Sequence, residues 1–370
     1  MEEGTITPEL DLYLQERSFT EKTDKKISKE ELEFILDVFL ESPYLKNKFP
    51  NRTLVENSLE LIGTNYEYDS YCFDYLDKKY LLKVNENDEE SVLLNEYENL
   101  KLIKSKNISP QCLHFGNLDF DAKIDFSLFN YEDSFSANLL PRSDFLFNIK
   151  TLGNTLSYLH ETKLEGVNEI ELYIDNIVYS VNFADFLTVD RFAALNENDS
   201  FAECSPIIEK FRDYITEEFS AENYPDASLC HTNLKATKIL FREGLFKFIN
   251  FESSYIIDPM IDLCLASFCL KIAKNKTHET NFVSAYYDSY SLDKIEKTEF
   301  LEKYETYKSK VAKILAIKCI SEFFTEICVY GNSRPQKFLN FIADYESIKP
   351  YLSEEEKVIL DKTFYIYSFE

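Results

Sequence analysis

The sequence predicts an α+β fold with two lobes, a small strand-rich lobe followed by a larger helical one. Between residues 54 and 128 most apolar stretches are short and separated by turn residues, as strands are. Beyond residue 137 apolar residues recur at helical spacing over most of the chain. The polar stretch 129–137 separates the two patterns, so we place the connection between the lobes there.

The predicted divisions are an N-terminal arm and helix over 1–50, a strand-rich lobe over 51–133 and a helical lobe over 134–370. Residues 1–28 are polar and irregular, and the acidic beginning MEEGTITPELD has no apolar segment of the kind that a signal peptide carries. The long apolar stretch 311–330 is interrupted by lysines and glutamates, which favours a buried helix over a membrane span. We therefore expect a cytoplasmic protein without a membrane partner.

The amino-acid composition limits the classes of binding partner that we expect. Acidic residues outnumber basic ones by 66 to 40, so the 370-residue chain has a formal charge of −26. A net acid repels nucleic acid and anionic lipid, and we expect a small molecule or a protein as the partner. With only 7 glycines, any glycine-rich phosphate loop must be reduced. The 8 cysteines form no C-x-x-C pair and there are 4 histidines, which argues against a zinc site or a disulfide scaffold.

The elements of the first lobe follow from capping residues and periodicity. Ser28 is expected to cap a helix that runs through Leu40. The pattern from about 54 to 84 predicts strands, of which 80–84 (YLLKV) is the clearest. A helix is expected over 89–104, and further strands at 113–115 and 122–128.

The second lobe is predicted to be mainly helical. Ser143 is expected to cap a helix that continues to Leu159, and Ser205 with Pro206 to begin another. Asp258 and Pro259 begin a further helix. Between these helices lies a compact β element: 228–230 is a short strand, and 239–241 pairs with 245–249 across a three-residue loop, 242–244.

Several chemically important residues follow one another along the chain. Lys83 ends an apolar strand, and Glu96 lies on the inward face of the next helix. Residues 230–240 read CHTNLKATKIL, and 249–252 read INFE. Shortly afterwards 258–263 read DPMIDL.

This order resembles the protein-kinase-like fold, and its details resemble the aminoglycoside phosphotransferase and choline kinase family. Members of that family read roughly H-G-D-L-x-x-x-N-I-L, then I-D-F/W-E, then D-P-x-x-D-L. The corresponding stretches here are HTNLKATKIL, INFE and DPMIDL. The resemblance covers about 55–330 and is specific in 225–265. It implies a two-lobed fold and, in active members, transfer of a phosphoryl group from ATP.

The departures from the family pattern fall on its chemical positions. The resemblance implies a catalytic Asp and two magnesium ligands where this chain has Asn233, Lys238 and Asn250. An amide cannot act as a general base at neutral pH, and loss of the base costs roughly 10²–10⁴-fold in rate. Magnesium prefers hard oxygen ligands, and an ammonium group repels it. We therefore expect a pseudokinase-like relative, catalytically impaired, that acts by binding a ligand, a nucleotide or a partner.

The same resemblance suggests roles for the remaining residues. Lys83 and Glu96 are expected to form an internal ion pair. Lys238 could occupy the place of the metal and contact phosphates directly, so that ATP or another nucleotide binds without magnesium and without turnover. The segment 63–70, where the family carries small residues around the phosphates, has one glycine and two acids. His231 is expected to be a structural hydrogen-bonding residue rather than a catalyst.

Alternatives remain open at this stage. Glu252 is the one acid left near the presumed site and a weak candidate for a metal ligand. An active ATP-dependent kinase of a small hydroxyl compound could use Glu252 or Asp258 in shifted roles. Transfer of a nucleotidyl group, or a scaffold without a ligand, are further possibilities. Asp262, in the first turn of its helix, is explained simply by the helix dipole.

Overall fold

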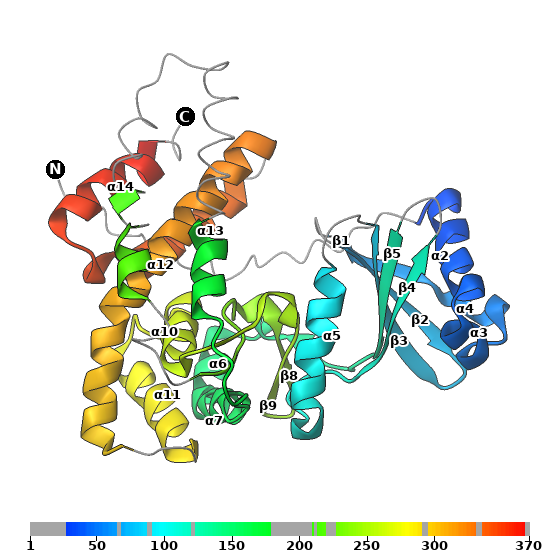
Figure 1. Cartoon of the computed structure of the whole chain (residues 1–370), viewed down its shortest axis with the longest axis horizontal. Helices are drawn as coiled ribbons and strands as arrows, with labels where there is room; N and C mark the ends of the chain where they lie inside the picture. The colour runs from blue at the N-terminus through cyan, green and yellow to red at the C-terminus, as the bar shows by residue number, and fades with distance from the viewer. Residues whose placement is uncertain are drawn as a thin grey trace. The chain divides into compact units, whose positions relative to one another are not determined.

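A computed structural model of the chain describes residues 27–64, 68–86, 91–119, 123–178, 209–210, 213–219, 227–290, 295–330 and 335–366, without the side chains of 321–330, 335–341 and 362–366. Residue contacts divide the chain into two units (Figure 1). We call 17–145 with 236–254 the strand-rich unit, and 146–235 with 255–370 the helical unit. The expected arm over 1–26 and the predicted helix start at Ser205 and Pro206 lie outside the described residues. The lobe boundaries predicted from the sequence stay a prediction.

The strand-rich unit is built on a five-stranded antiparallel sheet with the order β1-β2-β3-β5-β4. Successive side chains of the central strand β3 point to opposite faces of the sheet. Leu82 and Val84 belong to the apolar core, whereas Lys83 between them points to the opposite face, towards helix α5. The elements are β1 (Glu60–Thr64), β2 (Asp69–Tyr75), β3 (Lys78–Glu86), α5 (Val92–Ile103), β4 (Cys112–Asp119) and β5 (Lys123–Asn130).

Three helices, α2 (Lys29–Glu41), α3 (Pro43–Lys48) and α4 (Arg52–Ser58), cover the core face of this sheet (Figure 1). Ser28 caps α2 as predicted: its hydroxyl accepts from the N–H of Glu31, whose carboxylate accepts in return from the N–H of Ser28. The strand pattern expected from residue 54 is wrong at its start, because 52–58 form α4. A helix of seven residues, with one buried apolar side chain, is too short to show a helical period.

Aromatic rings fill the space between these helices and the sheet. The centroid of the Phe73 ring lies 5.2 Å from that of Phe39 and 5.1 Å from that of Phe49, both with edge-to-face geometry. The centroids of Phe49 and Tyr80 are 4.9 Å apart. Burying each of these rings contributes about 1.5–3 kcal/mol, so this cluster gives β3 a rigid support.

Residues 236–254 join the strand-rich unit through a second, three-stranded sheet with the order β6-β8-β9. In its hairpin Arg242 pairs with Leu245, so the loop consists of Glu243 and Gly244 alone. Both have a positive φ, +51° and +82°, as a two-residue hairpin turn of the primed type requires. The predicted three-residue loop is therefore wrong, because Arg242 continues the ladder. The strands are β6 (Phe135–Ser136), β8 (Ile239–Arg242) and β9 (Leu245–Phe248).

The helix expected from Ser143 to Leu159 is two helices, α6 (Arg142–Phe147) and α7 (Ile149–His160). Ser143 lies inside the first turn of α6 and is not its cap, and Asn148 separates the two helices. Gly153 allows close packing of α7 on α11 (Lys276–Ser289), because a Cβ atom there would lie 2.5 Å from the carbonyl oxygen of Phe282.

The core of the helical unit contains α10 (Pro259–Cys269), whose residues are buried almost throughout. Asp258 caps this helix and Pro259 begins it, as predicted. The strands β7 (Ser228–Cys230) and β10 (Tyr255–Ile257) pair antiparallel beside it. The remaining long helices are α12 (Lys297–Tyr330), α13 (Pro335–Ile348) and α14 (Glu354–Ile366). Among the described residues, none of the helices has the length and apolar character that crossing a membrane requires.

Candidate functional site

The strand-rich unit contains a buried ion pair between Lys83 of β3 and Glu96 of α5. The Lys83 Nζ atom lies 2.7 and 2.9 Å from the two carboxylate oxygens, and the side chains are 6% and 2% exposed. Ser91 caps α5, and Glu96 lies on the buried face of this helix with Leu93, Leu100 and Ile103. The structure therefore brings these two sequence-predicted residues together.

Two further oxygen atoms contact the Lys83 ammonium. The Asn250 Oδ1 atom lies 3.2 Å away and the Tyr68 hydroxyl 3.3 Å away. Burial by itself lowers the pKa of Lys83, but the negative charge of Glu96 outweighs it and raises the pKa above the ordinary value. Lys83 is therefore protonated at neutral pH, and Tyr68 is a site residue that sequence analysis missed.

Lys238 comes directly before β8 and Asn250 shortly after β9, so both lie at the open end of this hairpin. The Ile249 N–H donates to the Lys238 carbonyl at 3.0 Å, which sets the two segments side by side. Asn250 has φ of +65°, a left-handed conformation that asparagine adopts more readily than most residues. This conformation starts the short turn Phe251–Ser253, which contains Glu252.

Lys238 forms an ion pair with Glu252. The Nζ–Oε1 distance is 3.2 Å, and the side chains are 17% and 5% exposed. Burial raises the pKa of Glu252, but the charges of Lys238 and Lys83 outweigh it and hold the pKa of that carboxyl below its ordinary value. The weak metal candidate is thus a carboxylate whose charge a neighbouring lysine already neutralises.

The four charged groups of this cluster balance one another. Lys83 and Lys238 carry two positive charges, and Glu96 and Glu252 carry two negative ones. A magnesium ion here would have an amide at Asn250 and an ammonium at Lys238 where hard, anionic oxygens suit it best. These residues of the strand-rich unit do not fit a magnesium ion.

The helical unit contains the segment that follows β7, anchored on Asp262 of α10. The Asp262 Oδ2 atom accepts from the N–H of His231 at 2.8 Å, and Oδ1 accepts from the N–H of Thr232 at 2.9 Å. Thr232 has φ of +56°, a conformation uncommon for a β-branched residue. Two hydrogen bonds from consecutive amides thus fix the backbone just before Asn233.

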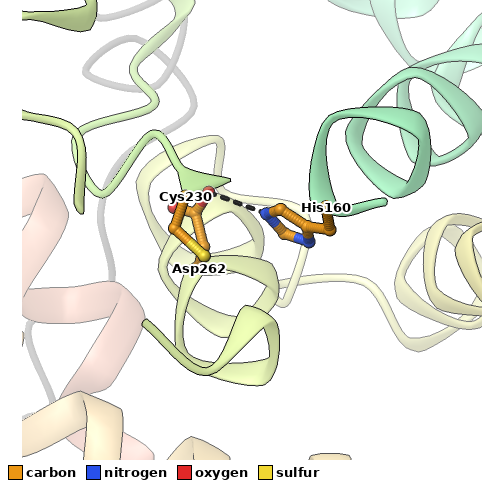
Figure 2. A group of neighbouring side chains, drawn as sticks. All are labelled: His160, Cys230 and Asp262. Atoms are coloured by element: carbon orange, nitrogen blue, oxygen red, sulfur yellow. Dashed lines mark hydrogen bonds and ion pairs between the residues drawn. The ribbon is translucent and has the colours of Figure 1, made fainter. Parts of the chain in front are cut away.

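A histidine completes the cluster around Asp262 (Figure 2). The His160 Nε2 atom lies 3.0 Å from Asp262 Oδ2, and its Nδ1 atom lies 2.8 Å from the Tyr286 hydroxyl. Asp262 and His160 are fully buried. The explanation of Asp262 by the helix dipole alone is therefore incomplete, because the carboxylate binds groups from two other segments.

His160, Cys230 and Asp262 together have the residue types of a metal site. One ligand atom from each lies within 4.8 Å of the other two. However, the Cys230 Sγ atom lies 3.5 Å from the Ile257 carbonyl as a donor, and burial raises the pKa of this thiol well above its ordinary value. A zinc ion requires a thiolate, so we interpret the group as a structural hydrogen-bond cluster.

Asn233, where the motif resemblance implies a catalytic base, is half-buried in a tight turn. Its N–H donates to the His231 carbonyl at 2.8 Å, and its own carbonyl accepts from Lys235 at 3.1 Å. His231 itself is fully buried, which agrees with a structural role. Asp258 is also engaged: one oxygen caps α10 and the other accepts from the Tyr307 hydroxyl at 2.7 Å.

Comparison with known proteins supports the fold. No family model and no curated protein sequence matches this chain. Among solved structures, a choline kinase from Cryptosporidium parvum has a TM-score of 0.57 at 14% identity and covers 91% of this chain and 98% of its own. An ethanolamine kinase from Plasmodium vivax has a TM-score of 0.53 at 17% identity, with coverage of 90% and 91%. A spectinomycin phosphotransferase in complex with ADP and spectinomycin has a TM-score of 0.51 at 15% identity, with coverage of 83% and 92%.

These likenesses define the class of fold. The chain has the two-lobed, α+β, protein-kinase-like fold of aminoglycoside phosphotransferases and choline or ethanolamine kinases. The resemblance predicted from the motifs of residues 230–263 is thereby confirmed for the fold. At identities of this level the comparison carries no conclusion about activity.

Proposed function

We propose that this chain is a catalytically impaired relative of small-molecule phosphotransferases and acts by binding a ligand, a nucleotide or a protein partner. The observation that carries the proposal is the ion pair between Lys238 and Glu252. At the position where the resemblance implies a magnesium ligand, this chain has an ammonium group, and the nearest acid already binds it.

The other two chemical positions support the same proposal. Asn233 supplies an amide where a general base is needed, and Asn250 uses its side-chain oxygen to accept a hydrogen bond from Lys83. The acids that could substitute for them are engaged, because Glu252 pairs with Lys238 and both oxygens of Asp258 accept hydrogen bonds. These contacts weigh against the alternative of an active kinase with shifted residues.

If a nucleotide is the ligand, its binding should not depend on metal. The Lys238 side chain is 17% exposed, and an ammonium group can contact phosphate oxygens directly. Nucleotide binding, a small-molecule or protein partner and a cytoplasmic location all stay predictions. The net charge of −26 supports the expectation that nucleic acid is not the partner.

A phosphate-release assay tests the proposal. Purified protein is incubated with ATP in magnesium and in EDTA, with choline, ethanolamine and spectinomycin as trial acceptors. We expect no magnesium-dependent ATP consumption. Magnesium-dependent consumption that disappears in Glu252→Ala but persists in Glu243→Ala, an exposed acid of the hairpin loop, would overturn the proposal.

A restored variant extends this test. Asn233→Asp, Lys238→Asn and Asn250→Asp together return the three positions to the family pattern. We expect this variant to bind magnesium where the wild-type chain does not, as measured by calorimetry. The unfolding transition of this variant must first match that of the wild type. Otherwise, failure of an unfolded variant to bind magnesium could be mistaken for failure of the restored site.

A further inference from the structure

Tyr68 lies against the Lys83 amine. It immediately precedes strand β2 and is only 5% exposed. The Lys83 Nζ atom lies 4.5 Å from the centroid of the Tyr68 ring and 3.3 Å from its hydroxyl oxygen. The ring therefore offers the ammonium both a hydrogen-bond acceptor and a cation–π contact.

The donors of Lys83 are fully used by these contacts. An ammonium group has three N–H donors and no acceptor. Four oxygen atoms lie within hydrogen-bond distance of Nζ: both oxygens of the Glu96 carboxylate, Asn250 Oδ1 and the Tyr68 hydroxyl. Four acceptors are therefore present for three donors. No N–H of Lys83 is left for a further anion.

The partners of Lys83 differ in charge and in their distance from Nζ. Glu96 is charged, lies closest to Nζ and is almost fully buried. Asn250 is fixed by the backbone turn that it begins. Tyr68 is neutral and makes the longest of the four contacts with Nζ.

We propose that Tyr68 closes the Lys83 site to anionic ligands, above all to the phosphate groups of a nucleotide, because its ring and hydroxyl contact the Lys83 amine. The proposal deepens the proposed function and rests on it for the location of the ligand site. It implies that the wild-type chain binds a protein partner or an uncharged ligand in preference to a nucleotide. A phosphate can reach the amine only if the buried tyrosine leaves it.

Calorimetric titration with ADP in EDTA tests this proposal. We expect ADP to bind Tyr68→Ala about tenfold more tightly than the wild type, because the ring and the hydroxyl no longer contact the Lys83 amine. Tyr68→Phe, which removes only the hydroxyl, should move the affinity in the same direction by a smaller factor. Tyr71→Phe is the matched control: Tyr71 lies in β2, the strand that Tyr68 precedes, and its hydroxyl donates to Glu31 instead of contacting Lys83. The affinity of this variant for ADP should equal that of the wild type.

The gain must also depend on Lys83. Adding Lys83→Met to Tyr68→Ala should abolish it. Equal affinities of the wild type, Tyr68→Ala and Tyr68→Phe would overturn the proposal, and so would a gain that survives Lys83→Met. If Tyr68→Ala does not fold, Tyr68→Phe alone decides. Magnesium-dependent ATP turnover by the wild type would overturn the proposed function separately, whatever the order of ADP affinities among these variants.

Discussion

Lys238 places a positive charge beside the buried carboxylate of Glu252. Its ammonium lies 3.2 Å from Glu252, a carboxylate that would otherwise be an uncompensated buried charge. A pair with such low exposure is desolvated far more than an ion pair on the surface. Its two members should therefore depend on each other for the stability of the fold.

A double-mutant cycle measures this dependence. Lys238→Met and Glu252→Gln should each lower the free energy of unfolding, and the double variant should lose less than the sum, with a coupling of about 1–2 kcal/mol. Urea unfolding of the four proteins gives the coupling. The pair Lys101–Glu98, half-exposed on α5, is the control and should show a coupling below about 0.5 kcal/mol. Additive losses at Lys238 and Glu252 would contradict this interpretation.

At the scale of elements, α10 organises the segment after β7. Asp262 accepts from two consecutive backbone amides of that segment and from His160 of α7, so one carboxylate connects three elements. A helix-dipole role alone would require none of these contacts. The backbone before Asn233 depends on this acid for its conformation.

Replacing this carboxylate tests its role. Asp262→Asn should lower the free energy of unfolding by about 2–4 kcal/mol, because an amide cannot accept from all three donors and leaves buried groups unsatisfied. The matched control is Glu299→Gln, an exposed acid in the first turn of α12, where only the dipole contribution is lost. Equal and small effects of the two substitutions in urea unfolding would favour the dipole explanation.

The same carboxylate predicts a dependence of stability on pH. Burial raises the pKa of Asp262, but the His160 contact and the backbone amide of His231 outweigh it, so the folded pKa lies below the ordinary value of 3.8. The unfolded chain then takes up the proton first. The stabilisation is complete above pH 3.8 and is lost as the pH falls through the lower folded pKa.

Urea unfolding of the wild type between about pH 5 and pH 2 should show this loss, and Asp262→Asn should show a shallower slope over the same range. Glu252→Gln should reduce the slope as well, since the pKa of Glu252 is also lowered in the folded state. Slopes that are identical in all three proteins would contradict the assignment.

Capping residues and apolar periodicity correctly predicted several helices and strands. Ser28 and Asp258 cap their helices, and 80–84 lies within a strand, because capping chemistry and apolar periodicity operate over a few neighbouring residues. Helix α4 was missed since seven residues show no period. The hairpin loop was predicted one residue too long, because its length depends on the cross-strand pair between Arg242 and Leu245.

The site was only partly predictable for a related reason. The motif spacing indicated the Lys83–Glu96 pair, which the structure shows at 2.7 Å. The contact of Tyr68, just before β2, with Lys83 of β3 joins residues fifteen positions apart, however, and no local pattern encodes it. Asp262 reaches partners 30 and 102 residues away in the sequence, so its role emerges only from tertiary packing.

At the scale of the whole molecule, the charge of −26 acts against the folded state. Like charges repel more strongly in a folded chain than in an expanded one, and salt screens that repulsion. Raising sodium chloride from about 10 to 300 mM should therefore raise Tm by a few degrees. Potassium chloride should give the same increase, and a Tm that falls with either salt would show that attractive ion pairs dominate.

The central proposal is that internal ion pairs stand at the positions where the resemblance to phosphotransferases implies a metal site. Nucleotide-induced thermal stabilisation, measured with ADP and ATP in magnesium and again in EDTA, tests it most directly. The account predicts that any increase in Tm is the same under both conditions. An increase that appears with magnesium and disappears with EDTA would contradict it.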